Sequence, residues 1–127
     1  MLTISGLTIC FLTLLLTGLS LNISRLRILH RVSYGPANQR DLEVAVRAHG
    51  NCLEQSLVFM LLLVIAELMQ SPANLLVVLA ISFTASRSLH AIAIFMRRLL
   101  ARQIAHAISL LMQISCGSII FWKLVEV

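Results

Sequence analysis

Charged residues are scarce in this chain: they make up 12% of its 127 residues, while 59% of the residues are hydrophobic. Soluble domains contain about 25% charged residues, so about half of the usual solvated surface is missing. A chain buried in a lipid bilayer accounts for this deficit, whereas a water-soluble core does not. The composition therefore predicts an integral membrane protein.

Aromatic residues and cysteines are also few. The formal net charge of +5 would suggest a nucleic-acid partner, but an aromatic content of 6% supplies too few stacking platforms for bases. The three cysteines are Cys10, Cys52 and Cys116, and an odd number without a C-x-x-C pair gives no disulfide framework. The sequence has no zinc-ligand spacing, Ser-His-acid triad or Gly-rich phosphate loop. We therefore expect neither a nucleic-acid partner nor a metal.

Four apolar stretches are each long enough to cross a hydrocarbon core of about 30 Å, which needs roughly 20 helical residues. Helices are predicted over about residues 2–29, 41–70, 73–96 and 102–124. The first stretch carries no charge before Arg25, so it lacks the basic region of a secretory signal peptide and is expected to be retained. We expect an all-α, integral membrane four-helix bundle that forms a single domain over residues 1–127.

Basic residues gather around two of the three connections between these helices. The connection over residues 70–74 is short and uncharged. Positively charged connections stay on the cytoplasmic side of a membrane. The sequence therefore predicts that the first and third connections are cytoplasmic and that both termini lie outside. The basic residues concerned are Arg25, Arg27, Arg31, Arg40 and Arg47 around the first connection, and Arg97, Arg98 and Arg102 around the third.

A polar stripe runs along the first half of the second predicted helix. At 100° per residue, Arg40, Glu43, Arg47, Asn51 and Glu54 fall within an arc of about 80°. One interpretation is that these charges pair with one another on a helix extension in the cytoplasm. However, Glu54 lies close to the apolar run, where a carboxylate costs several kcal/mol unless it is paired. In a binding site for a zwitterionic ligand, the Glu54 carboxylate would pair with the positive group of the ligand.

A second stripe follows the third predicted helix, where Arg87, His90 and Arg98 share one face. A guanidinium at membrane depth requires an acceptor. We expect Glu54, or an equivalent carboxylate of a neighbouring subunit, to accept from Arg87. His90 is either a packed histidine or a functional one, and the spacing leaves both interpretations open.

Two further ionisable residues lie near predicted helix ends. Glu67 is close to the end of the second helix and His106 is near the start of the fourth. Long polar side chains near helix ends can reach the membrane interface while their stems stay in apolar surroundings. We expect both side chains to do so.

A small multidrug transporter is a competing interpretation, because those proteins are also four-helix membrane proteins of similar length. They have a membrane-embedded glutamate in the first helix. Residues 5–24 of this chain contain threonine, serine and Asn22 but no acid. This departure weakens the transporter interpretation.

Residues 47–54 read Arg-Ala-His-Gly-Asn-Cys-Leu-Glu. This R-A-H-x-N-x-x-E pattern resembles the signature of the MAPEG superfamily, the membrane-associated proteins in eicosanoid and glutathione metabolism. The similarity extends to residues 31–35, which resemble a loop of bacterial members, and to residues 87–91, which resemble the R-x-x-H segment of the family's third helix. Chain length and helix number agree as well.

The resemblance implies a homotrimer in a bacterial inner membrane, surrounded by lipid, with glutathione bound on the cytoplasmic side between subunits. It implies a glutathione transferase, or a peroxidase, that acts on a hydrophobic small molecule. The residues implied to bind glutathione are Arg47, Asn51, Glu54, Arg87 and His90. The arginine that lowers the pKa of the glutathione thiol is expected to be Arg102, with Arg98 as the second choice.

The sequence also departs from the family pattern. Members commonly have tyrosine directly after the glutamate and proline two places later, where this chain has Gln55 and Leu57. Many eukaryotic members also have tyrosine at the position of Ile94, which cannot donate a hydrogen bond to a thiolate. These departures favour an alternative, a non-catalytic MAPEG-like binding or structural membrane protein.

Overall fold

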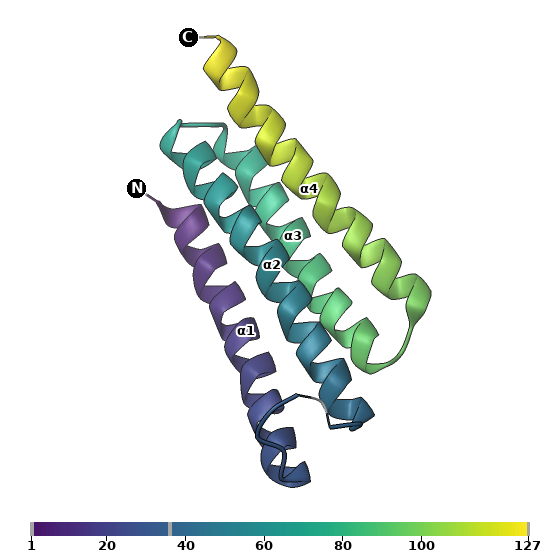
Figure 1. Ribbon diagram of the computed structural model, residues 1–127. Helices are drawn as coiled ribbons and strands as arrows, with labels where there is room; N and C mark the ends of the chain where they lie inside the picture. The colour runs from purple at the N-terminus through teal and green to yellow at the C-terminus, as the bar shows by residue number, and fades with distance from the viewer. Residues whose placement is uncertain (1, 36, 127) are drawn as a thin grey trace.

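The computed structural model describes residues 2–35 and 37–126. Its helices run alternately up and down (Figure 1). They are α1 (Thr3–His30), α2 (Arg40–Leu68), α3 (Ala73–Phe95) and α4 (Leu99–Val125). Each helix is long and apolar enough to cross a membrane. The predicted all-α, four-helix membrane bundle is therefore confirmed.

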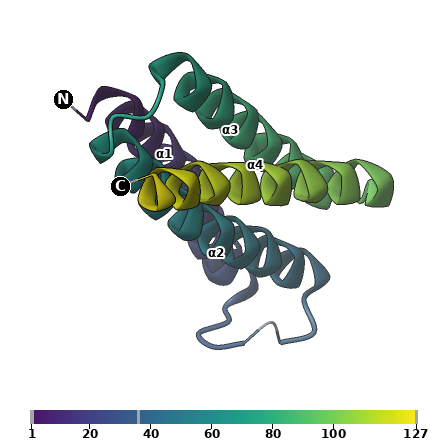
Figure 2. The same ribbon diagram turned by 90° about the horizontal axis from the view of Figure 1, so that it is seen from above.

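The helices α2 and α3 are central, because each contacts all three of the other helices. In Figure 1, α1 and α4 lie on opposite sides of α2 and α3. Viewed from above, α4 lies between the ribbons of α2 and α3 and contacts both (Figure 2). Large hydrophobic side chains remain exposed along all four helices. In a bilayer, lipid tails cover such surfaces. On a soluble monomer, apolar patches of this size would indicate an interaction site.

One end of the bundle, which we call the arginine-rich end, holds the α1–α2 and α3–α4 connections. Arg31 and Arg97 follow α1 and α3 there, each in the left-handed conformation at φ 54°. In both turns, backbone N–H groups beyond the helix end donate to carbonyls of its last turn. Because Arg97 reverses the chain so tightly, α4 begins at Leu99 rather than at residue 102 as predicted. Arg102 therefore lies within α4 and not in the connection.

The half of the bundle away from the arginine-rich end has an apolar core. Phe59 of α2 and Phe83 of α3 stack there, with ring centroids 3.9 Å apart and planes 9° from parallel. Aromatic rings packed this way contribute more than their buried area alone. Apolar side chains from all the helices surround the stack, and the fully buried ones include Leu12, Leu63, Leu76 and Cys116. The other half holds the polar stripes.

The carboxylate of Glu67 joins the end of α2 to the start of α1. Its Oε1 accepts from the backbone N–H of Ile4 at 2.9 Å, and its Oε2 accepts from the N–H and hydroxyl of Ser5 at 2.7 and 2.6 Å. The first N–H groups of a helix have no partner inside the helix. The sequence did not predict this contact, in which N–H groups at the start of α1 hold the Glu67 carboxylate.

Replacing Glu67 with alanine should therefore destabilise the bundle. The variant loses the carboxylate that accepts from three donors of α1, and because Glu67 is partly exposed we expect a loss of about 1.5 kcal/mol. Thermal unfolding in detergent, followed by circular dichroism, measures this loss. Glu126→Ala, at an exposed carboxylate beyond α4, is the matched control. An equal effect of the two substitutions would contradict a capping role for Glu67.

Candidate functional site

A polar groove of about 590 Å³ opens on the surface between α2, α3 and α4. Five of the six residues expected to form the site line this groove: Arg47, Asn51, Glu54, His90 and Arg102. Gly50, Ile94, Gln103 and His106 complete its lining. The structure thus gathers side chains from three helices that lie far apart in the sequence.

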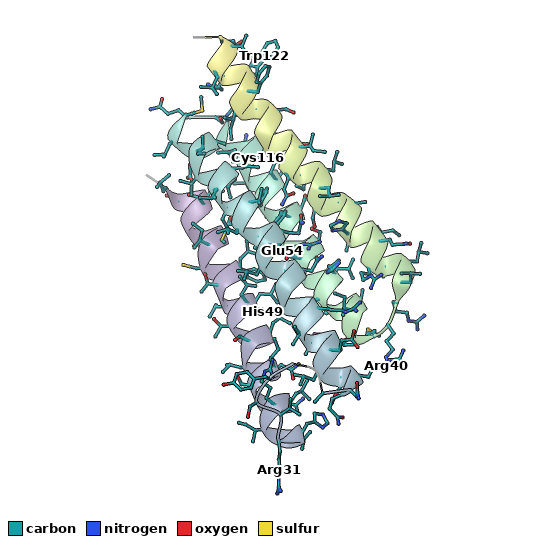
Figure 3. The ribbon with its side chains drawn as sticks, in the orientation of Figure 1. Arg31, Arg40, His49, Glu54, Cys116 and Trp122 are labelled. Carbon is teal, nitrogen blue, oxygen red and sulfur yellow. The ribbon has the colours of Figure 1, made fainter. Side chains whose placement is uncertain are left out.

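The α2 wall of the groove carries both signs of charge. Arg47 Nη2 donates to Glu43 Oε1 at 2.8 Å, one helical turn away. Both side chains are exposed, so this pair is weak and leaves the guanidinium available for a ligand. Glu54 lies deeper, about halfway along the bundle (Figure 3). At 1.5 Å per residue, Glu54 is about 21 Å along the helix from the start of α2. Its carboxylate forms no salt bridge within residues 2–35 and 37–126.

Arg87 lies behind the groove, with no exposed surface. Its Nε donates to Ser109 Oγ at 2.8 Å and its Nη1 donates to Asn51 Oδ1 at 3.0 Å. The prediction that Glu54 of the same chain accepts from Arg87 was wrong. Asn51 faces the bundle interior, whereas Glu54 points to its exposed flank. Arg87 therefore acts on the groove through Asn51, whose amide it orients.

Two histidines lie side by side in the wall formed by α3 and α4. The ring centroids of His90 and His106 are 6.0 Å apart. His106 was expected at the membrane interface, but it lines the groove. The sequence did contain a signal for this position: His106 follows Arg102 by four residues, so both lie on one face of α4. Within the described part of the chain, the buried Nδ1 atoms of both histidines and Nη2 of Arg87 have no hydrogen-bond partner.

A second hollow, which we call the arginine pocket, adjoins the groove at the arginine-rich end and has a volume of about 380 Å³. Its charged lining consists of Arg40, Glu43, Arg47, Arg97, Arg98 and Arg102. Arg47 and Arg102 border both hollows, whereas Arg98 borders only the arginine pocket. Of the two arginines considered for thiol activation, Arg102 is thus the one in the groove. Sequence reasoning missed this pocket because the tight turn at Arg97 creates it.

The groove combines guanidinium, amide, carboxylate and imidazole groups. Such a set complements a flexible zwitterion with separated carboxylates and an ammonium group, because arginine binds carboxylates in a planar, bidentate way. Over residues 2–35 and 37–126, no group of three or more His, Cys, Asp or Glu side chains could hold a metal ion.

The sequence profile of the MAPEG family matches residues 5–122. The chain belongs to the MAPEG family. It is 30% identical over 87 residues to the inner membrane protein YecN of Escherichia coli strain K12, and equally to that of strain O6:H1. These 87 residues are 68% of this chain and 66% of YecN, just under two thirds of the relative's length. No solved structure matches.

The MAPEG match covers the whole site. It begins near the start of α1 and ends close to the end of α4, and so includes every residue that lines the groove and the arginine pocket. The resemblance read from residues 47–54 and 87–91 is confirmed at the level of the family. The polar stripe of α2 thus belongs to a MAPEG-type bundle.

Proposed function

We propose that this MAPEG protein is a multi-pass protein of the bacterial inner membrane that binds glutathione in the polar groove and conjugates it to hydrophobic electrophiles. The observation that carries the proposal is the alignment of Arg47, Asn51 and Glu54 on α2 opposite Arg102 on α4. The inner-membrane location rests on the similarity to YecN, an inner membrane protein.

Each charged part of glutathione has a complementary group in the groove. Arg47 and Arg102 would clamp the two carboxylates with bidentate hydrogen bonds. Glu54 would receive the ammonium group, which supplies the partner that this carboxylate otherwise lacks. Asn51, held by the 3.0 Å bond from Arg87, would meet a peptide group. A ligand of this charge pattern thereby offsets the cost of a carboxylate placed about halfway along a membrane-length helix.

The proposed reaction is a nucleophilic attack by sulfur. The thiolate is the reactive form of glutathione, and a nearby guanidinium lowers the pKa of a thiol. We assign this role to Arg102, while His90 supports the same wall from α3. The thiol releases its proton to water, the thiolate forms a carbon–sulfur bond, and the leaving group departs with its electron pair. The exposed apolar helix faces would admit the electrophile from the lipid.

We also propose a homotrimer with both termini outside and the arginine-rich end in the cytoplasm. The groove is open on the surface of a single bundle. A neighbouring subunit could cover it, so that glutathione would lie between two chains. The eight arginines around the α1–α2 and α3–α4 connections support this orientation under the positive-inside rule.

A second candidate function is non-catalytic binding. Ile94 lines the groove at the position where many family enzymes have a tyrosine, so that hydrogen-bond donor to a thiolate is missing. A protein of this kind would bind glutathione normally and show no turnover with a panel of electrophiles. Turnover with any of them separates the enzyme from the binding protein.

Glu54→Gln tests glutathione recognition, because it removes the charge and keeps the shape of the side chain. We expect glutathione affinity to fall at least tenfold, since a hydrogen bond to a charged group contributes about 1.5–3 kcal/mol. Calorimetric titration in detergent measures the affinity. Glu126→Gln, outside the groove, should leave it unchanged. Wild-type affinity in Glu54→Gln would remove the carboxylate from the proposed site.

A further inference from the structure

Three arginines of the arginine pocket, Arg40, Arg97 and Arg98, border that pocket but not the polar groove. We propose that they bind the phosphate of an anionic phospholipid headgroup. This lipid site adjoins the proposed glutathione site, and the inference rests on the proposed function in that glutathione takes Arg47 and Arg102.

The arginine pocket holds more positive charge than glutathione can neutralise. Five guanidinium groups and one carboxylate line it. That carboxylate, Glu43, is paired with Arg47 at 2.8 Å. Glutathione has two carboxylates and an ammonium group, and its carboxylates already suit Arg47 and Arg102. Arg40, Arg97 and Arg98 therefore present positive charge to a second anion.

The start of α4 adds backbone donors to the same pocket. Leu99, the first residue of α4, lines it. The cap residue Arg98 makes no side-chain capping bond, and the first turn of α4 contains no acidic residue. The first N–H groups of a helix lack partners inside the helix and favour an anion. Together with arginines, which bind phosphate in a bidentate way, this arrangement suits a phosphate group with its several oxygens.

The surface around the pocket suits a lipid better than a free phosphate. The pocket lies at the arginine-rich end, where membrane-length helices begin and end. Met96, Leu99 and Leu100 expose 62%, 57% and 70% of their surface beside it. Acyl chains can continue along these side chains, whereas an inorganic ion makes no use of them. Basic pockets between transmembrane helices are a known way to hold anionic headgroups.

Arg97 and Arg31 form a matched pair for a test. Both follow a helix at the arginine-rich end, and both have φ 54°. Glycine is the residue that favours this left-handed conformation. Arg97→Gly and Arg31→Gly therefore remove the same charge while relaxing the same kind of turn, so neither should unfold the protein. Only Arg97 lines the arginine pocket.

The experiment measures lipid binding to protein purified in detergent, by native mass spectrometry and by the shift in melting temperature on adding lipid. Phosphatidylglycerol should bind and stabilise the wild type, and phosphatidylcholine should do neither at the same concentration. Arg97→Gly should weaken phosphatidylglycerol binding about fivefold, the effect of one arginine near an anionic surface. Arg31→Gly should retain wild-type binding.

Three results would overturn the lipid site: equal losses in Arg97→Gly and Arg31→Gly, equal binding of phosphatidylcholine, or displacement of the lipid by millimolar inorganic phosphate. The last would assign the pocket to a free anion. Glutathione titration of Arg97→Gly keeps the two sites apart. Unchanged glutathione affinity with lost lipid binding is the expected result, and loss of both together would contradict a separate lipid site.

Discussion

Arg87→Met is expected to keep the thermal stability of the bundle close to that of the wild type, whereas Arg87→Ala should lower the free energy of unfolding by about 3 kcal/mol. Arg87 is fully buried and has no carboxylate partner in the described part of the chain, so its guanidinium carries a desolvation cost of several kcal/mol. Methionine removes that cost and fills most of the volume, which offsets the hydrogen bonds lost to Ser109 and Asn51. Alanine leaves a cavity, and large-to-small changes in a core typically cost 2–5 kcal/mol.

Both Arg87 variants should bind glutathione at least tenfold more weakly. The 3.0 Å bond from Arg87 fixes the side-chain amide of Asn51, so its loss lets that amide turn away from the ligand. Thermal unfolding and calorimetric titration, performed on the same preparations, separate stability from binding. Arg25→Met is the matched control, because Arg25 is exposed on α1 and, among residues 2–35 and 37–126, donates only to Asn22. If Arg87→Met unfolds as readily as Arg87→Ala, the hydrogen bonds rather than the packed volume hold these helices.

Ile94→Tyr should increase the rate of glutathione conjugation by tenfold or more. Ile94 lines the groove beside His90 and Arg102, and a tyrosine there supplies a hydroxyl that can donate to the developing thiolate. One such donor is worth tenfold to several hundredfold in rate. The measurements are thiolate absorbance near neutral pH and turnover with a hydrophobic electrophile.

Ile94→Phe is the control for this gain, because it adds the same ring without the hydroxyl. We expect it to show no rise in thiolate absorbance and no faster turnover than the wild type. Equal activation by phenylalanine and tyrosine would mean that ring packing, and not hydrogen bonding, changes the site. Bound glutathione without turnover in the tyrosine variant would favour the non-catalytic alternative.

Helical periodicity predicted correctly which residues of α2 share a face. Arg47, Asn51 and Glu54 recur at intervals of four and three residues, and all three line one groove. Local spacing within one helix is enough for such a prediction. The same holds for the number of helices, because each apolar stretch is long enough to cross a membrane.

Contacts between helices were harder to predict. The acceptors of Arg87 depend on how α3 is placed against α2 and α4, and a long side chain can reach several candidates from one backbone position. Ser109 of α4, 22 residues away, accepts from its Nε, and nothing in the sequence pattern singles out this serine. The start of α4 was misplaced for a different reason: Arg97 adopts a left-handed turn that glycine usually forms.

The stack of Phe59 on Phe83 has a consequence for ion permeability. The polar groove extends only to about the middle of the membrane-length helices, as far as Glu54, and the apolar core with this stack fills the half beyond it. We expect this core to block water and ions that enter the groove, much as hydrophobic constrictions close channels by dewetting. A charged groove that ends at such a core would then cause no leak of protons across the membrane.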